Sequence, residues 1–185
     1  MGKRRLIGKI VILMLGLAAV VILAANSDTI PVSTPKKGYR VVIDPGHGGS
    51  DCGAVGVSGV KEAGLNLAVS LYLKEELEAL GMEAILTRSD ERALAEGKKA
   101  DMAARGKIMN GEGVDLVVSV HMNKFTDPSV HGPMAFYMKG SAEGEKLAKT
   151  VIDSITDELG APRRIANPGD YYVIRESMPV SVLVE

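Results

Sequence analysis

The sequence predicts an α/β fold in which buried strands alternate with amphipathic helices. Two short segments, Val41–Ile43 and Leu116–Val120, are mostly apolar and rich in β-branched residues, which is typical of strands covered on both faces. Between them, apolar residues recur at helical spacing from Leu65 to Leu80. The chain has 185 residues and is 46% hydrophobic, so it is long enough for one domain with a substantial core and an appendage.

The appendage is the N-terminal segment, where four basic residues precede an apolar run from Ile10 to Ala25. We expect residues 1–25 to be a signal anchor or a signal peptide, because basic flanks keep the N-terminus in the cytoplasm and send the following domain outside. Leu23 is a large residue where a cleavable peptide needs a small one, which favours an uncleaved membrane anchor. Residues 26–38 contain scattered Pro, Ser and Thr and are predicted to be a linker to a domain at 39–185.

Charge and cysteine content exclude several classes of protein. The formal net charge is -1, and without the four basic residues of the N-terminal segment it is -5, so we expect no nucleic-acid partner. The single cysteine, Cys52, excludes an internal disulfide framework and a cysteine-rich metal cluster. The sequence also lacks a P-loop, a Rossmann glycine fingerprint, a nucleophile elbow and an H-E-x-x-H pair. A zinc site would therefore have to be assembled from distant segments.

The first predicted strand leads directly into a loop that carries a histidine. The sequence RVVIDPGHGGSD, from Arg40 to Asp51, ends the strand at Asp44-Pro45-Gly46 and places His47 among glycines. Glycines let the backbone bend and approach a ligand closely, and the carboxyl end of a buried α/β strand is where such folds bind ligands. His47 is therefore a candidate site residue, although an isolated histidine in a turn more often only hydrogen-bonds to nearby backbone.

A helix is predicted to begin at Lys61-Glu62 and to end at Gly81, where a C-terminal cap belongs. Its expected buried face is apolar and consists of Leu65, Ala68, Val69, Leu73, Leu77 and Leu80. Glu62 lies at or just before the first turn, so its side chain could project back toward the strand ends. Taken alone, a glutamate that interacts with the helix dipole is the simpler interpretation.

The middle of the chain repeats the pattern of the first strand. A strand is predicted over Met82–Thr87 and a helix over 98–110, and the strand Leu116–Val120 then leads to His121 and Asn123. Two strands that each end in a histidine bring those histidines together if the strands are parallel neighbours. We therefore expect His47 and His121 to converge.

The remaining elements are predicted from local patterns. Met134–Met138 has the pattern of a strand, and Ser141 can cap a helix whose apolar face extends to Leu159. We further expect a turn at Asn167-Pro168-Gly169, a short strand at Tyr171–Ile174 and a last strand at Ser181–Val184, which ends in Glu185.

Two histidines and one carboxylate with an open fourth position form a common catalytic zinc shell. His47, Glu62 and His121 fit that requirement. A further carboxylate is needed to take a proton from water and pass it to the leaving nitrogen, and Glu185, at the end of an apolar strand, is the best placed.

From about Arg40 to Glu185 the chain resembles the zinc-dependent N-acetylmuramoyl-L-alanine amidases of the type 3 class. The matching motifs are Val41 to Gly49, Glu62 with Asn66, Ser119 to Asn123, and Pro179 to Glu185; Thr87-Arg88 and Arg105 with Asn110 match intermediate positions. The resemblance implies a twisted, mostly parallel sheet of about six strands flanked by helices on both faces. It also implies one Zn2+ held by His47, Glu62 and His121, with Glu185 as the catalytic acid and base.

The same resemblance implies that residues 39–185 are an amidase catalytic domain acting on peptidoglycan, at the amide between N-acetylmuramic acid and L-alanine of the stem peptide. Asn66, Asn123 and Arg88 stand at matching positions and are candidates for substrate binding. With its N-terminal hydrophobic segment and no recognisable wall-binding repeat, the chain looks most like the spore-cortex germination amidases. We therefore expect it to be membrane-anchored or exported, with an extracytoplasmic catalytic domain.

The chain departs from the family pattern after Glu185, where family members continue with a Gly-Phe loop and a closing helix. We therefore expect a domain truncated at its C-terminus, with apolar surface exposed on the last strand and Glu185 on a frayed end. This departure motivates a second hypothesis, a noncatalytic, membrane-tethered cell-wall-binding remnant. A third hypothesis is a thiol hydrolase that uses Cys52 with His47 or His121.

Overall fold

A computed structural model describes residues 38–127, 129–162 and 164–185. The expected anchor or signal segment at 1–25 and the linker up to residue 37 lie outside this range. Within it, no helix combines the length and the apolar character needed to cross a bilayer.

The core element is a six-stranded sheet with the order β2-β1-β3-β6-β4-β5. Its strands are β1 (Arg40–Pro45), β2 (Glu83–Leu86), β3 (Leu116–Val120), β4 (Ala135–Met138), β5 (Asn167–Gly169) and β6 (Val180–Val184). The first four neighbours, β2, β1, β3 and β6, run parallel to one another, whereas β4 is antiparallel to β6 and parallel to β5. The predicted mostly parallel sheet is confirmed.

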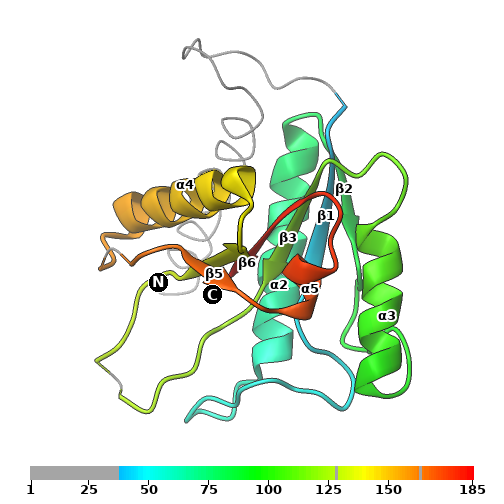
Figure 1. Cartoon of the computed structure of the whole chain (residues 1–185). Coiled ribbons are helices and arrows are strands. Elements are labelled where there is room, and N and C mark those ends of the chain that lie inside the picture. The colour runs from blue at the N-terminus through cyan, green and yellow to red at the C-terminus, as the bar shows by residue number, and fades with distance from the viewer. Residues whose placement is uncertain (1–37, 128, 163) are drawn as a thin grey trace.

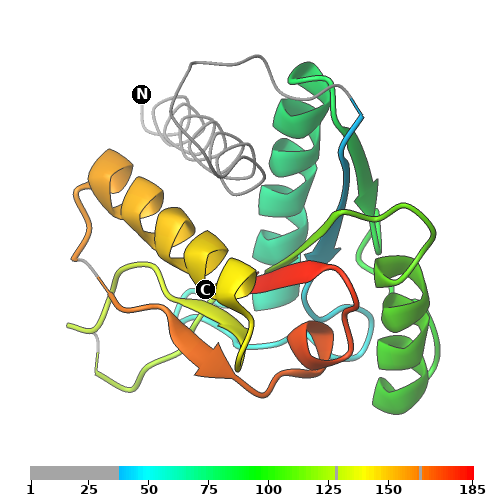
Figure 2. The ribbon, with the colours of Figure 1, turned by 45° about the horizontal axis from the view of Figure 1, so that its top comes forward.

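Helices cover both faces of this sheet (Figures 1 and 2). The helices are α2 (Glu62–Ala79), α3 (Lys98–Met109), α4 (Ala142–Leu159) and α5 (Tyr172–Arg175). Helices α2 and α4 pack on one face, in a core that includes Val41, Leu73 and Leu147. On the other face, the end of α3 and the short α5 pack in a second core around Val42 and Leu183. Because side chains alternate along a strand, β1 contributes to both cores, which explains its continuous apolar run.

Strand β6 lies inside the sheet, between β3 and β4, and it is covered on both faces. Val182 contacts the α4 side and is fully buried, and Leu183 contacts the α5 side and is 2% exposed. The expectation that this strand would present apolar surface is therefore wrong, because α4 and α5 cover it.

Two local predictions between α4 and β6 are also wrong. Asn167–Gly169 is the edge strand β5, not a turn, and Tyr172–Arg175 is a helical turn, not a strand. Proline is tolerated in β5 because the strand pairs only with β4 and leaves one edge unpaired. In α5, the apolar Val173 and Ile174 pack under the sheet, so tertiary packing overrides their local strand propensity.

The buried face of α2 differs from the predicted apolar face. Leu65 is 44% exposed and Ala68 is exposed. The face that packs on the sheet instead begins with polar residues and consists of Glu62, Asn66, Leu67, Ser70, Leu73 and Leu77. The helix is rotated because its first turns serve the loop at the strand ends, where polar side chains find hydrogen-bonding partners.

The parallel register places three strand ends side by side. Pro45 pairs with Val120, and Val120 pairs with Val184. Beyond the strands, the N–H of Gly46 donates to the carbonyl of Val120, and the N–H of His121 donates to that of Val184, each at 2.9 Å. The residues that follow β1, β3 and β6 therefore meet at one edge of the sheet.

Candidate active site

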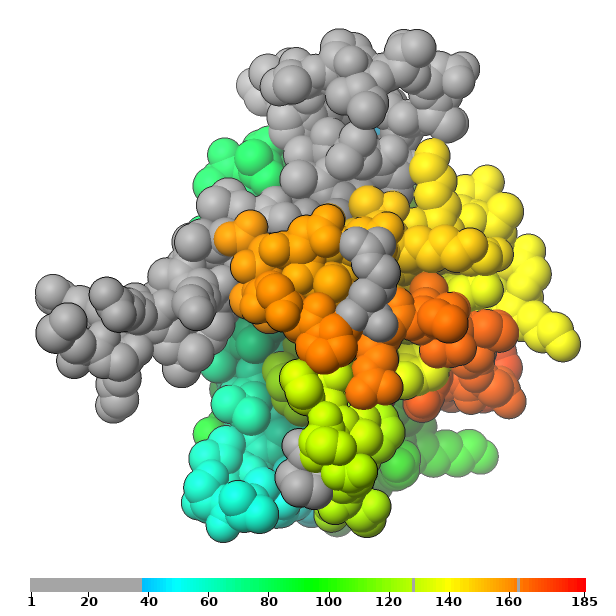
Figure 3. Space-filling view, turned by 90° about the vertical axis from the view of Figure 1, so that its left-hand side faces the viewer, coloured from blue at the N-terminus to red at the C-terminus, as the bar shows by residue number. Residues whose placement is uncertain are grey.

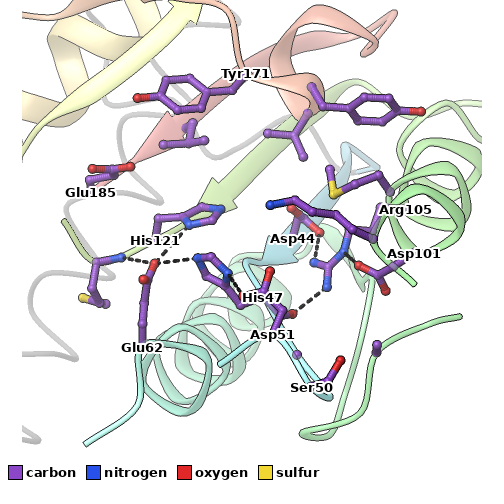
Figure 4. Close-up of a pocket in the computed structure, with 18 of the residues that line it drawn as sticks. Asp44, His47, Ser50, Asp51, Glu62, Asp101, Arg105, His121, Tyr171 and Glu185 are labelled. Carbon is purple, nitrogen blue, oxygen red and sulfur yellow. Dashed lines mark hydrogen bonds and ion pairs between the residues drawn. The ribbon is translucent and has the colours of Figure 1, made fainter. Parts of the chain in front are cut away.

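The ends of β1 and β3 and the first residue of α2 converge at this edge of the sheet (Figure 4). His47 Nε2 and His121 Nδ1 each lie 3.1 Å from the same atom, Glu62 Oε1. The two imidazole rings pack edge to face, with centroids 4.9 Å apart. The predicted convergence of His47 with His121, and the projection of Glu62 toward them, are therefore present in the structure.

Glu62 is held as a carboxylate by two backbone donors in addition to the histidines. The N–H of Ala54 donates to Oε2 at 2.8 Å, and the N–H of Met122 donates to Oε1 at 3.1 Å. Burial by itself would raise the pKa of Glu62, but the hydrogen bonds from His121 and these amides, with the charge of His47, lower the pKa to about 2. Glu62 is therefore ionised at neutral pH and available as an anionic ligand.

Two glycines provide the space in which the three side chains meet. A Cβ atom on Gly46 would lie 2.3 Å from the His121 ring, and one on Gly53 would lie 2.6 Å from Glu62 Oε2. His47 itself has a φ of 63°, a left-handed conformation that is uncommon for residues other than glycine. The loop therefore holds a backbone geometry that needs support from its surroundings.

That support comes from a buried ion cluster below the loop. Arg105, on α3, donates to the carbonyl of His47 at 2.6 Å, to Asp44 Oδ1 at 2.8 Å and to Asp101 Oδ2 at 2.8 Å. Asp44 also accepts from Thr87 and Ser119, at 2.6 and 2.9 Å. Burial by itself would raise the pKa of Asp44, but Arg105 and the two hydroxyls lower it below the ordinary value.

Arg88 and Asn66 support the same loop from behind. The Arg88 guanidinium donates to the carbonyls of Pro45, Gly46, Ala63 and Asp90 at 2.8 to 2.9 Å. Asn66 Nδ2 donates to the Gly46 carbonyl at 3.2 Å and to Glu62 Oε1 at 3.3 Å. Both side chains are buried, and neither lines the cavity over the histidines. Their contacts indicate a positioning role, and their predicted contact with substrate stays a prediction.

The histidines open into a cavity of about 730 Å³ that contains Glu185. Asn123, the third predicted substrate contact, also lines it, together with Lys124, Tyr171 and Tyr172. Burial raises the pKa of Glu185, and the neighbouring Glu62 raises it further, whereas His121 and His47 oppose the shift. The cavity therefore presents a carboxyl group beside the two imidazoles.

Glu185 does not lie on a frayed strand end, contrary to expectation. Its N–H donates to the carbonyl of Met134 at 2.8 Å, and its own carbonyl oxygen accepts from the N–H of Met134 at 2.6 Å. Met134, the residue just before β4, therefore continues the antiparallel pairing past Val184 and fixes the backbone of Glu185.

The third histidine and the cysteine lie away from this cluster. His131 is exposed on the loop between β3 and β4, where its Nδ1 lies 2.7 Å from the Ser129 carbonyl. In Figure 3 this loop (yellow-green) lies on the surface below α4 (orange). The half-buried Cys52 thiol donates to the Gly53 carbonyl at 3.4 Å, and Cys52 does not line the cavity.

Asp51, Asp44 and Asp101 are not among the site residues predicted from the sequence. Asp51 Oδ1 lies 3.0 Å from His47 Nδ1. An acidic residue four positions after a candidate ligand is a signal that could have been used, because ligating histidines usually bond to a second carboxylate or carbonyl. The Asp44–Arg105 pair is separated by 61 residues in sequence, so it could not be found without the fold.

The donor set fits a zinc ion. Two imidazole nitrogens and one carboxylate oxygen all lie within 4.8 Å of one another. Tetrahedral zinc with bonds of about 2.0–2.1 Å separates its ligand atoms by about 3.3 Å, and the two nitrogen-to-oxygen distances here are 3.1 Å. The ligand types match a catalytic zinc shell with an open fourth position.

Known proteins resemble this chain over most of the described residues. Residues 41–185 match the family model described as N-acetylmuramoyl-L-alanine amidase. The germination-specific N-acetylmuramoyl-L-alanine amidase of Bacillus subtilis is 31% identical over 169 residues, which cover 86% of this chain and 71% of that protein. The amidase AmiA of Escherichia coli is 33% identical over 126 residues, which cover 68% of this chain and 42% of that protein.

Solved structures show the same likeness. The CwlD amidase from Clostridioides difficile, in complex with the GerS lipoprotein, superposes with a TM-score of 0.74 and 28% identity, over 80% of this chain and 81% of that one. The catalytic domain of CwlV, an N-acetylmuramoyl-L-alanine amidase from Bacillus (Paenibacillus) polymyxa, gives 0.68 and 30%, over 80% and 79% of the two chains.

Proposed function

This chain belongs to the N-acetylmuramoyl-L-alanine amidase family, type 3 class, and on that premise we propose that it hydrolyses peptidoglycan with one zinc ion held by His47, Glu62 and His121. The family reaction breaks the amide between N-acetylmuramic acid and the L-alanine of the stem peptide. The observation that carries the proposal is the meeting of three parallel strand ends, because it puts the two imidazoles and Glu185 in one open cavity.

Each side chain has a distinct task in this proposal. A zinc ion bound there supplies Lewis acidity and lowers the pKa of a bound water toward about 7. Glu62 and the histidines hold the ion, and the low pKa of Glu62 keeps it anionic. Glu185 accepts a proton from the attacking water and delivers it to the nitrogen of the departing L-alanine. Its anchored backbone beside Met134 keeps the carboxyl group in the cavity.

Asn123 is the proposed substrate contact, because it follows His121 closely and lines the cavity. We assign Arg88 and Asn66 an indirect part, through the Pro45–Gly46 backbone that they hold. The cavity lining also includes Lys124, Tyr171 and Tyr172, side chains that can hydrogen-bond to the sugars and peptide groups of the proposed substrate.

The biological setting is proposed from the relatives. The germination-specific enzyme of Bacillus subtilis supports a role in germination, and we propose the spore cortex as the site of action. The relatives of this chain are amidases of cell-wall material, which supports a location outside the cytoplasm. The apolar segment 1–25 is the proposed membrane tether. The CwlD amidase was solved with a lipoprotein, which makes a lipoprotein a reasonable class of partner to test by co-purification.

The proposed reaction is tested by incubating the zinc-loaded protein with purified peptidoglycan and measuring new N-terminal L-alanine on released stem peptides. We expect multiple turnovers, and we expect Glu185→Gln to reduce the rate by about 10²–10⁴-fold while it keeps its zinc. His131→Ala is the matched control and should release peptide at the wild-type rate. Binding of peptidoglycan without release would favour the noncatalytic hypothesis, and release that survives chelation but fails in Cys52→Ser would favour the thiol hydrolase.

A further inference from the structure

We propose that Asp51 is a positioning residue that holds the His47 ring so that Nε2 faces the metal site, an inference that rests on the metal centre proposed above. The two ring nitrogens of His47 face different carboxylates. Nε2 lies 3.1 Å from Glu62 Oε1, and Nδ1 lies 3.0 Å from Asp51 Oδ1 (Figure 4). Asp51 therefore contacts the nitrogen that does not face the proposed site.

Asp51 is itself fixed by backbone hydrogen bonds within the loop. The N–H of Gly53 donates to Asp51 Oδ1 at 3.1 Å. Gly48 and Asp51 exchange two backbone hydrogen bonds, at 2.8 and 3.1 Å. Arg105 binds the carbonyl of His47 from below at 2.6 Å. The loop is thus closed around His47, and the Asp51 carboxylate is aimed at the ring.

The chemistry of a neutral imidazole requires such a partner. Only one ring nitrogen of a neutral histidine carries a proton, and a ligating nitrogen must present its lone pair. If the proton were on Nε2, that N–H would donate a hydrogen bond to the Glu62 carboxylate. The lone pair would then be on Nδ1, which faces away from the proposed metal site. A carboxylate at Nδ1 keeps the proton there, fixes the ring orientation and raises the basicity of Nε2.

The structure also offers a matched control for the loop role of Asp51. Asp127 Oδ1 accepts the N–H of Ser129 at 2.9 Å, which is the same two-residue turn that Asp51 makes with Gly53. Asp127 contacts no histidine in the described part of the chain and does not line the cavity. Asp127→Ala therefore removes an equivalent turn without removing a partner of a ligand.

The experiment measures zinc dissociation constants by chelator competition for the wild type, Asp51→Ala, Asp51→Asn, Asp127→Ala and His47→Ala. Second carboxylates of this kind change metal affinity by about 10–100-fold, so we expect that loss in Asp51→Ala. Asp51→Asn keeps a neutral acceptor for both His47 and Gly53 and should fall between Asp51→Ala and the wild type. Asp127→Ala should bind zinc like the wild type.

A second readout examines the ring directly. In the zinc-loaded protein, the Nδ1 proton of His47 should give a slowly exchanging NMR signal, shifted in Asp51→Asn and lost to exchange in Asp51→Ala. If Asp51→Ala keeps both its zinc affinity and this signal while His47→Ala loses zinc, Asp51 has no positioning role and the metal site stands. If Asp51→Asn matches the wild type in both readouts, a neutral acceptor is sufficient to hold the ring, and the contribution of the carboxylate charge to the basicity of Nε2 is overturned. Retention of zinc by His47→Ala would overturn the metal site and this inference together.

Discussion

Gly46 shows how a single methyl group can decide whether the site forms. A Cβ there would lie 2.3 Å from the His121 ring, a separation at which the ring or the loop must shift. We expect Gly46→Ala to weaken zinc binding by about tenfold or more, because one of only three proposed protein ligands is displaced. Isothermal titration with zinc measures the effect.

Gly64 provides the control for this substitution. It lies in α2, and a Cβ there meets nothing within 4 Å. Gly64→Ala should keep the wild-type zinc affinity and raise the free energy of unfolding by about 0.5–1 kcal/mol, because alanine is the better helix former. Equal zinc affinity in both glycine variants would show that the space at Gly46 does not matter.

Glu62 makes the stability of the metal-free protein depend on pH. The pKa of Glu62 in the folded protein is lowered from the ordinary value of 4.5 to about 2. A carboxylate with a depressed pKa contributes stability that is fully present above about pH 4.5 and is lost as the pH falls toward about 2. We therefore expect the wild type to be more stable than Glu62→Gln at pH 6, and this difference in the free energy of unfolding to shrink as the pH falls. Urea unfolding at a series of pH values, down to the acid limit of the assay, measures the difference. A difference that stays constant over this range would contradict the assignment.

At the scale of elements, Arg105 on α3 binds both the carboxyl end of β1 and the His47 loop. The Arg105 and Asp44 side chains are 2% and 1% exposed. Arg105→Ala leaves the Asp44 charge buried without its partner, and breaking a buried pair in this way costs about 3–5 kcal/mol. We expect that loss in the free energy of unfolding, measured by urea denaturation of the metal-free protein.

The exposed pair of Arg92 with Asp90 is the control, because its arginine side chain is 86% exposed. Arg92→Ala should leave the unfolding midpoint unchanged, since exposed ion pairs contribute little. If Arg105→Ala were equally silent, α3 would not anchor the loop as described.

The strands were predictable where burial on both faces leaves a continuous apolar signal, as at Val41–Ile43 and in β3. The orientation of α2 was not, because its buried face begins with Glu62, Asn66 and Ser70, and apolar periodicity cannot detect a polar face that is buried for the sake of a site. Residues 167–169 were predicted to be a turn, but pairing with β4 makes them the strand β5. Residues 171–174 were predicted to be a strand, but packing under the sheet makes most of them the helical turn α5.

Some residues of the candidate site were likewise predictable from the sequence, and others were not. His47, His121 and Glu185 were predictable because each follows a strand, and parallel strands bring their carboxyl ends to one edge of a sheet. To predict Glu62 as a site residue, one also has to know that its helix begins at that edge. Asp44 and Arg105 are neighbours only in the fold, and although both stand at positions that match the family, the sequence does not indicate that they pair.

At the scale of the whole molecule, the proposed metal site ties together three segments that are far apart in the sequence. His47 follows β1, His121 follows β3, and both contact the first residue of α2. A metal that binds only the folded state stabilises it by about 4 kcal/mol at a thousandfold excess over its dissociation constant. We expect zinc to raise the unfolding temperature accordingly and EDTA to reverse the effect. The same stabilisation in a His47→Ala/His121→Ala variant would place the zinc elsewhere.

The most direct test of the account is the zinc content of purified variants, measured by inductively coupled plasma mass spectrometry. We predict one zinc ion per chain in the wild type, Glu185→Gln and His131→Ala, and a loss of zinc in His47→Ala, Glu62→Ala and His121→Ala, because only the last three remove a proposed ligand. Loss of zinc in His131→Ala, with retention in either the His47 or the His121 variant, would contradict the site at the three strand ends.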